Sequence, residues 1–101
     1  MVSFRLEGQT LHVAGEIDLS TSQALRERVD EALRAGSVTL DMTGVEFIDS
    51  TGINVLLQAT AELNGQGPIR IVASRQVARI FEITGLDARP EIELATADSA
   101  S

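Results

Sequence analysis

Residues 45–53 read VEFIDSTGI, and this stretch is the most informative part of the chain for its fold. Its first four residues are strand-like, and its last residue begins a run of apolar side chains at helical spacing. The Asp, Ser and Thr at the junction are residue types that accept hydrogen bonds from the free N–H groups of a helix start. The stretch therefore predicts a strand that passes directly into a helix.

Upstream of this stretch, the pattern predicts a hairpin followed by an amphipathic helix. Residues 4–7 and 10–17 alternate apolar with polar side chains, and Gly8-Gln9 forms a two-residue turn between them. The period then changes to that of a helix, with Ser20 or Thr21 as the N-cap and Gly36 just past the end. The apolar positions of this helix are Leu25, Val29, Ala32 and Leu33.

A further strand is expected at residues 38–42, and Thr43-Gly44 are expected to break it before residues 45–48. The helix that begins after Asp49 is expected to end near Asn64-Gly65. The residues at helical spacing that mark it are Ile53, Leu56, Leu57, Thr60 and Leu63.

The last part of the chain repeats the alternation of strand and helix. Residues 69–73 predict a strand, and Ser74 caps a helix that stops at Thr84-Gly85. Residues 92–94 predict a short edge strand. Residues 95–101 are small and polar, and we expect them to form a flexible tail.

These elements indicate an α/β fold with a mixed sheet, in which an N-terminal hairpin is joined to parallel strands. Connections between parallel strands are right-handed, so the helices are expected to pack mainly on one face. A chain of 101 residues has room for one core, and we expect a single domain over 1–101 with its core at about 4–94.

Composition excludes several classes of function. The chain has 15 acidic residues against 8 Lys and Arg, and its net charge of -7 argues against contact with nucleic acid or an anionic membrane. It has no Cys, which excludes a disulfide scaffold and a Cys-based metal site or nucleophile. No apolar run approaches the ~20 residues of a membrane span. We expect a cytoplasmic protein without membrane insertion, metal or cofactor.

Asp49-Ser50-Thr51-Gly52 is the densest cluster of reactive residues in the chain. In one interpretation it is a helix cap, with Asp49 or Ser50 accepting hydrogen bonds and Gly52 permitting a tight turn. In the other, Ser50 is a phosphorylation site at the rim of the domain. A phosphate there lies at the positive end of the helix dipole, so the helix accepts it without unfolding.

Other chemistry fits the spacing poorly. A nucleophile elbow needs glycine two residues before Ser50, where the chain has Ile48. The only base available to a hydrolase is His12, a strand residue with no evident orienting partner, to which we assign no role. Asp18, Asp41 and Asp49 stand at strand ends, but no spacing rule supports a metal site there.

Three segments in order carry a resemblance to a known family: residues 15–18 (GEID), 47–53 (FIDSTGI) and 81–86 (FEITGL). The chain resembles STAS domains, in particular the stand-alone bacterial anti-sigma factor antagonists, over residues 4–94. One departure is Asn54, where close relatives often have glycine, and this bears on how closely a partner approaches the helix.

The resemblance implies a binding switch that is not itself an enzyme. In this family the serine at the position of Ser50 is phosphorylated by a serine kinase that doubles as the anti-sigma factor. The unphosphorylated antagonist binds that kinase and frees a sigma factor, and the phosphorylated antagonist lets go. A serine phosphatase resets the switch.

Several roles around Ser50 remain open at this stage. Asp18 contacts the partner or is a solvated loop acid, and Asp49 orients Ser50 or is only an N-cap. Thr51 is a second phosphate acceptor or a turn hydroxyl. Helical angles turn Asn54 and Val55 away from the core, beside Ser50. The predicted partner surface comprises Asp18, Asp49, Thr51, Gly52, Asn54 and Val55.

Two other functions are weighed against this switch. The first is an accessory STAS subunit of a stress-signalling or lipid-transport complex. The second is a small serine hydrolase that uses Ser50.

Overall fold

The computed structural model describes residues 1–36, 39–62 and 68–97. The helices and strands follow one another as β1 (Val2–Glu7), β2 (Thr10–Ile17), α1 (Ser22–Arg34), β3 (Thr39–Ile48), α2 (Ser50–Ala61), β4 (Ile69–Ser74), α3 (Arg75–Thr84), the 3₁₀ turn η1 (Leu86–Ala88) and β5 (Ile92–Ala97).

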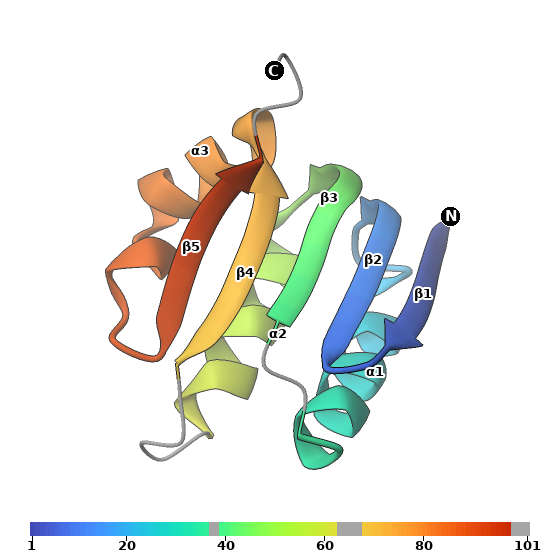
Figure 1. Ribbon diagram of the computed structural model, residues 1–101. Coiled ribbons are helices and arrows are strands. Elements are labelled where there is room, and N and C mark those ends of the chain that lie inside the picture. The colour runs from blue at the N-terminus through green and yellow to red at the C-terminus, as the bar shows by residue number, and fades with distance from the viewer. Residues whose placement is uncertain (37–38, 63–67, 98–101) are drawn as a thin grey trace.

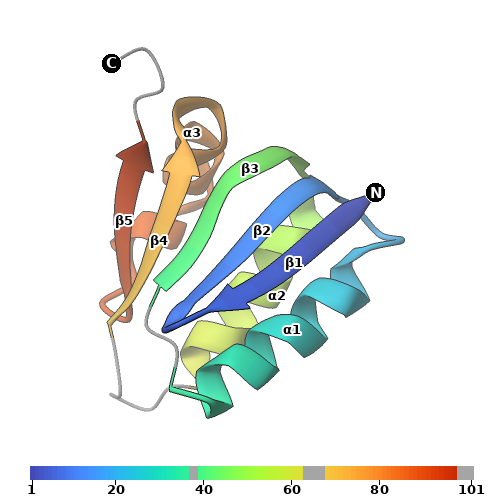
Figure 2. The ribbon, with the colours of Figure 1, turned by 45° about the vertical axis from the view of Figure 1, so that its right-hand side comes forward.

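The five strands form one mixed sheet in the order β1-β2-β3-β4-β5. β1 pairs antiparallel with β2, and every other neighbouring pair is parallel. The three α-helices lie behind the sheet in Figure 1, and Figure 2 shows α1 and α2 side by side across the strands β1 to β3. The predicted hairpin, parallel strands and one-sided helix layer are confirmed.

The core fills the space between this face of the sheet and the helices. α1 buries Leu25, Val29 and Ala32, as its spacing predicts. α3 begins at Ser74, whose hydroxyl accepts a hydrogen bond from the Val77 amide at 3.3 Å. It ends at Gly85, whose φ of +82° is readily adopted only by glycine. The largest of the fully buried side chains are Ile17, Leu25, Val29, Leu40, Met42, Val45, Leu56, Ile71, Val77, Phe81 and Leu86.

Hydrogen bonds between polar side chains link α1 to α2. The Arg26 guanidinium donates to Gln58 Oε1 at 2.7 Å and to Glu62 Oε2 at 3.0 Å. It also pairs with Asp30 at 3.0 Å, one turn along its own helix. Arg26 therefore links the first helix to the last turn of the second.

The predicted break at Thr43-Gly44 is wrong, because β3 continues through it to Ile48. Gly44 pairs with Ala14 of β2, and a Cβ at Gly44 would lie 2.8 Å from the Ala14 Cβ. The glycine therefore serves close approach of two strands rather than a turn. The register of the β2–β3 ladder shifts once between His12 and Ala14 and again between Gly15 and Glu16.

The predicted limits of the core are also too narrow. β1 begins at Val2, and residues 95–97, expected in a flexible tail, extend β5 by pairing with residues 72–74 of β4. α2 ends at Ala61 with Glu62 as C-cap, earlier than the predicted end. Val38, Leu63, Asn64-Gly65 and the last four residues lie outside the described residues.

No helix in the described part of the chain is long and apolar enough to span a membrane.

Candidate functional site

The carboxyl ends of β2 and β3 bring the first and second sequence motifs together. Ile17 and Ile48 are partners in the parallel ladder, and the Asp49 amide donates to the Ile17 carbonyl at 3.1 Å. Asp18 and Asp49 therefore follow adjacent strand ends. The loop that carries Asp18 lies beside the start of α2, where Ser50 is the first residue.

Asp49 is the N-cap of α2. Its backbone is extended, and its Oδ1 accepts hydrogen bonds from the Thr51 amide at 2.9 Å and the Gly52 amide at 3.4 Å. The same oxygen accepts the Thr51 hydroxyl at 2.5 Å. The capping interpretation of Asp49 is confirmed, because its carboxylate satisfies N–H groups that a helix start leaves free.

The two neighbouring hydroxyl groups at this helix start differ in their surroundings. Ser50 is exposed, and within the described residues its hydroxyl makes no hydrogen bond. Thr51 is half-buried, and its hydroxyl donates to Asp49. Ser50 thus offers a free hydroxyl on the surface at the positive end of a helix dipole, and Thr51 does not.

Gly52 sets the height of this helix start above the sheet. A Cβ on Gly52 would lie 2.5 Å from Ile17 Cγ2 and 2.7 Å from Ile48 Cγ1. Gly52 is itself buried. Gly52 therefore serves to position Ser50 and does not itself form part of an exposed surface.

The predicted exposure of Val55 is wrong. Its side chain is only 8% exposed and belongs to the core. α2 packs against α1 as well as against the sheet (Figure 2). Its buried face is therefore wider than that of a helix that contacts the sheet alone. Asn54, one turn after Ser50, is exposed as predicted.

Hydrogen bonds hold the loop after β2 in place. The Asp18 carboxylate accepts the Ser20 hydroxyl at 2.7 Å and the Ser20 amide at 2.9 Å. The Thr21 hydroxyl donates to the Glu16 carbonyl at 2.9 Å. The hydrogen bond from the Ser20 hydroxyl is the largest cause that lowers the pKa of Asp18, so Asp18 presents a negative charge at neutral pH.

Sequence reasoning missed two residues beside this site. Leu19 is 78% exposed in the loop after β2, and Phe47 is 50% exposed near the end of β3. The pattern of residues 45–48 predicts one strand-like segment and does not single out Phe47. The period of two contained the signal, because it turns Phe47 away from the face on which Ile48 is buried.

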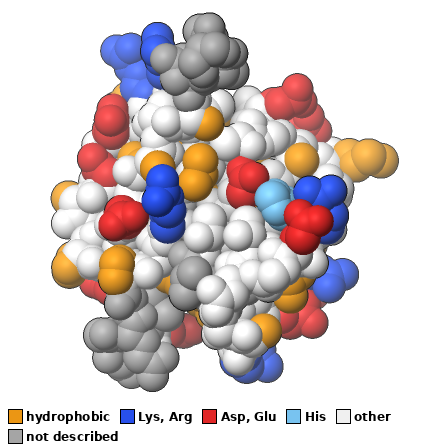
Figure 3. All heavy atoms as spheres, viewed as in Figure 1, with side chains coloured by type: hydrophobic (Ala, Val, Ile, Leu, Met, Phe, Trp, Pro, Cys, Tyr) orange, Lys and Arg blue, Asp and Glu red, His pale blue; other side chains and the backbone are white. Residues whose placement is uncertain are grey.

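His12 was expected to have no orienting partner, and this is wrong. Its Nδ1 lies 2.9 Å from Asp41 Oδ2, and its Nε2 lies 3.4 Å from Glu7 Oε1. Figure 3 shows the His side chain, in pale blue, with acidic side chains on either side of it. Burial raises the pKa of Asp41, but hydrogen bonds from Thr43 and His12 outweigh it and lower that pKa. The cluster gives Ser50 no base, because Asp41 precedes the end of β3 by roughly 20 Å of extended strand.

The same distance separates Asp41 from Asp18 and Asp49. The part of the chain that the structure describes holds no group of three or more His, Asp or Glu side chains suited to a metal ion.

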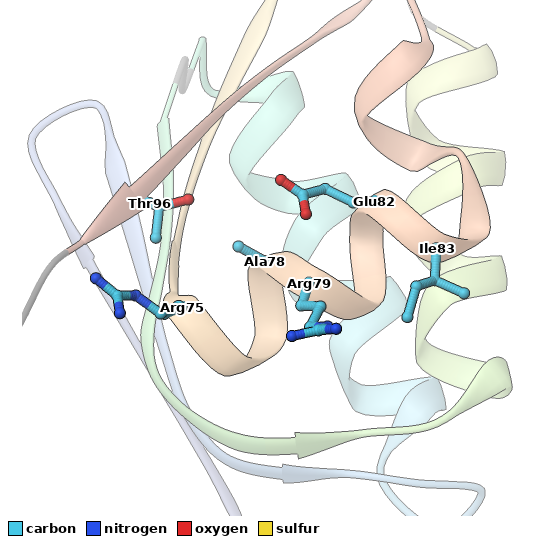
Figure 4. A pocket seen from close by; sticks show the side chains of 6 residues that line it. All are labelled: Arg75, Ala78, Arg79, Glu82, Ile83 and Thr96. Carbon is cyan, nitrogen blue, oxygen red and sulfur yellow. The ribbon is translucent and has the colours of Figure 1, made fainter.

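A shallow groove of about 430 Å³ lies at α3 and β5, the edge of the sheet opposite to β1 (Figure 4). It is lined by Arg79, Glu82 and Ile83 of α3 and by Thr96 of β5. The groove is open and contains none of the residues around Ser50.

Comparison with known proteins agrees with the three motifs. A family model described as "Mlab, STAS domain" matches residues 1–95. An anti-sigma-B factor antagonist of Listeria monocytogenes is 34% identical over 87 residues, which cover 82% of this chain and 76% of that protein. The chain belongs to the STAS-domain family of anti-sigma factor antagonists.

Other members of the family are also similar in sequence. The anti-sigma-F factor antagonist RsfB of Mycobacterium tuberculosis is 37% identical over 81 residues, which cover 76% of this chain and 66% of that protein. The chain thus spans slightly less than two thirds of RsfB.

Solved structures of the family share the fold. An anti-sigma factor antagonist from Mycobacterium paratuberculosis superposes with a TM-score of 0.78 at 24% identity, covering 96% of this chain and 86% of that one. SpoIIAA in its unphosphorylated form gives a TM-score of 0.64 at 23% identity, with 99% and 92% coverage.

Proposed function

We propose that this STAS domain is an anti-sigma factor antagonist controlled at Ser50. The unphosphorylated chain binds an anti-sigma factor serine kinase in the bacterial cytoplasm and thereby frees a sigma factor. The kinase phosphorylates Ser50, the complex separates, and a serine phosphatase restores the binding form. The observation that carries the proposal is the exposed Ser50 hydroxyl at the start of α2, beside a Thr51 hydroxyl that is already engaged.

The surroundings of Ser50 explain how a phosphate acts there. The helix start accepts the added charge, because a phosphate at the positive end of a helix dipole is favourable by roughly 0.3–1 kcal/mol. The fold is therefore expected to stay unchanged. Asp18 and Asp49 lie in the adjoining turns, so the phosphate adds to local negative charge.

Release follows from desolvation at the contact surface. A protein interface typically removes ~800 Å² of each partner from water. A phosphate enclosed there without a matched cation loses several kcal/mol of hydration. A net loss of about 3–4 kcal/mol is two to three decades in affinity. Attraction from cations at a solvated rim, about 0–1 kcal/mol for each pair, is too weak to offset it.

The site of phosphorylation tests this proposal directly. The chain is incubated with ATP and each purified anti-sigma factor kinase encoded in the same genome, and phosphopeptides are mapped by mass spectrometry. We expect phosphate on Ser50, none on Thr51, and none on the Ser50→Ala variant. The Ser50→Ala variant is expected to keep its affinity for the kinase when ATP is added. Modification of Thr51, or of neither residue, would contradict the proposal.

A second candidate is an accessory STAS subunit of a larger complex. It is favoured by the description of the matching family model, which names Mlab rather than an anti-sigma factor antagonist. This role predicts co-purification in one constant assembly whose size ATP does not change. The antagonist role predicts a complex that ATP dissociates.

Family membership favours either regulatory role over a serine hydrolase. The separation of His12 and Asp41 from Ser50 agrees with this preference. A hydrolase would be labelled by a fluorophosphonate at Ser50. We expect no labelling of this chain.

A further inference from the structure

Two exposed apolar side chains occur near the carboxyl ends of β2 and β3, the end of the sheet at which Ser50 lies. In the parallel ladder, Glu16 of β2 pairs with Phe47 of β3. Leu19 lies three residues beyond Glu16, and Ser50 lies three residues beyond Phe47. The two apolar side chains therefore stand on adjacent segments at the same end of the sheet as Ser50, with 78% of Leu19 and 50% of Phe47 exposed.

The backbone that presents Leu19 is held before any partner arrives. The Asp18 carboxylate accepts hydrogen bonds from the hydroxyl and the amide of Ser20. The Thr21 hydroxyl donates a hydrogen bond to the Glu16 carbonyl, so the loop is fixed both before and after Leu19. Phe47 lies in a paired strand. Side chains on a backbone that is already ordered lose less conformational entropy on binding, so more of their contact energy contributes to affinity.

The charge around this apolar pair has one sign. Residues 14–22 and 43–54 contain Glu16, Asp18, Glu46 and Asp49, and no Arg or Lys. The Met1 ammonium group lies 2.9 Å from Glu16 and offsets part of this charge. A partner that approaches this end of the sheet at long range is favoured if its own surface is positive.

We propose that Leu19 and Phe47 are the apolar anchors of the surface that binds the anti-sigma factor, and that the partner presents an apolar recess bordered by Arg or Lys side chains. This inference rests on the proposed function and names the chemistry of its partner surface. It also replaces the predicted role of Val55, which is buried in the core. A phosphate on Ser50 stays hydrated, and its hydration shell keeps Leu19 and Phe47 from entering the apolar recess of the partner.

The chain offers a matched control for the anchors. Ile83 is 77% exposed, almost as much as Leu19, but it lies on α3 in the groove that faces β5 (Figure 4). Serine at either position removes a similar apolar surface from solvent contact. Only the position relative to Ser50 differs.

The test is calorimetric titration of the anti-sigma factor that binds the wild-type chain among those encoded in the same genome. We expect Leu19→Ser and Phe47→Ser each to weaken binding by roughly tenfold or more, and Ile83→Ser by less than about twofold. Thermal unfolding checks that each variant folds. Leu19→Ser keeps the test decisive if Phe47→Ser does not fold, because Leu19 lies in an exposed loop.

The outcomes separate the inference from the proposed function. If the wild type binds and Leu19→Ser binds no worse than Ile83→Ser, the anchors are wrong and the antagonist role stands. If the wild type binds none of the anti-sigma factors, both are overturned.

A second titration tests the charge of the recess. Raising the salt from about 50 mM to about 300 mM is expected to weaken wild-type binding. Glu46→Gln is expected to reduce that salt dependence, whereas Glu93→Gln, on β5, is expected to leave it unchanged. Affinity that does not change with salt would overturn the basic border of the recess.

Discussion

Gly52→Ala tests the packing that positions Ser50. The new methyl carbon would lie 2.5 Å from Ile17 Cγ2 and 2.7 Å from Ile48 Cγ1, closer than carbon atoms approach in folded proteins. Ile17 is fully buried and Ile48 is 3% exposed, so neither side chain has solvent to move into. Overpacking of this kind costs about 1–3 kcal/mol. Alanine is a better helix former than glycine, and this difference offsets up to about 1 kcal/mol of that cost.

We therefore expect Gly52→Ala to destabilise the fold by about 1–2 kcal/mol. Urea unfolding followed by far-ultraviolet circular dichroism measures this as a lower midpoint with an unchanged slope. Asn54→Ala, on the exposed face of the same helix, is the control and is expected to be neutral or slightly stabilising. A Gly52→Ala variant as stable as the wild type would refute the close approach of α2 to the two strands.

A double-mutant cycle assigns the loss to a particular contact. Ile17→Ala alone is expected to cost about 2–5 kcal/mol, because it leaves a cavity in the core. In that background the Gly52→Ala methyl group no longer meets Ile17 Cγ2, so its additional cost should fall to the part that comes from Ile48 Cγ1 at 2.7 Å. If the two losses of stability are strictly additive, the methyl group of Gly52→Ala does not contact Ile17.

Three further predictions follow from single side chains. Asp49→Ala removes the α2 cap and is expected to cost about 0.5–2 kcal/mol in urea unfolding, whereas Asp49→Asn should keep most of that free energy. The hydrogen bonds of Asp41 lower its folded pKa, so its stabilising effect is present above the unfolded value of about 3.9 and is lost as the pH falls through the folded value. Urea titrations should therefore show Asp41→Asn less stable than the wild type at about pH 7, with the gap closing in acid; a gap that widens in acid would reverse the sign. Arg26→Ala should lower stability by about 1 kcal/mol through the lost link between α1 and α2, whereas Arg28→Ala, which breaks an exposed pair within α1, should change it by a few tenths. Equal losses in the two variants would contradict the link.

Features that depend on nearby residues were predictable from the sequence. The Asp49 cap of α2, the Ser74 cap of α3 and the glycine at the end of α3 all occur as expected. Each is determined by contacts within a few residues, and the hydrogen bonds of a helix end require particular side chains. The alternation of strand and helix then leaves few arrangements, because parallel connections are right-handed.

Features that depend on distant residues were not predictable in the same way. Val55 is buried on a helix that packs beside α1 as well as against the sheet, and helical angles within α2 do not reveal that second neighbour. Gly44 continues a strand because Ala14 lies beside it in β2. The pairing of His12 with Asp41 likewise depends on strand register, which the hydrophobic pattern alone sets only loosely.

The most direct test of the account is the affinity of the anti-sigma factor for the chain with and without phosphate on Ser50. The phosphorylated chain is purified after mass spectrometry has confirmed modification at Ser50 alone, and both forms are titrated under the same conditions. The account predicts a loss of about two to three decades in affinity, with the circular dichroism spectrum unchanged. Equal affinity of the two forms would contradict it.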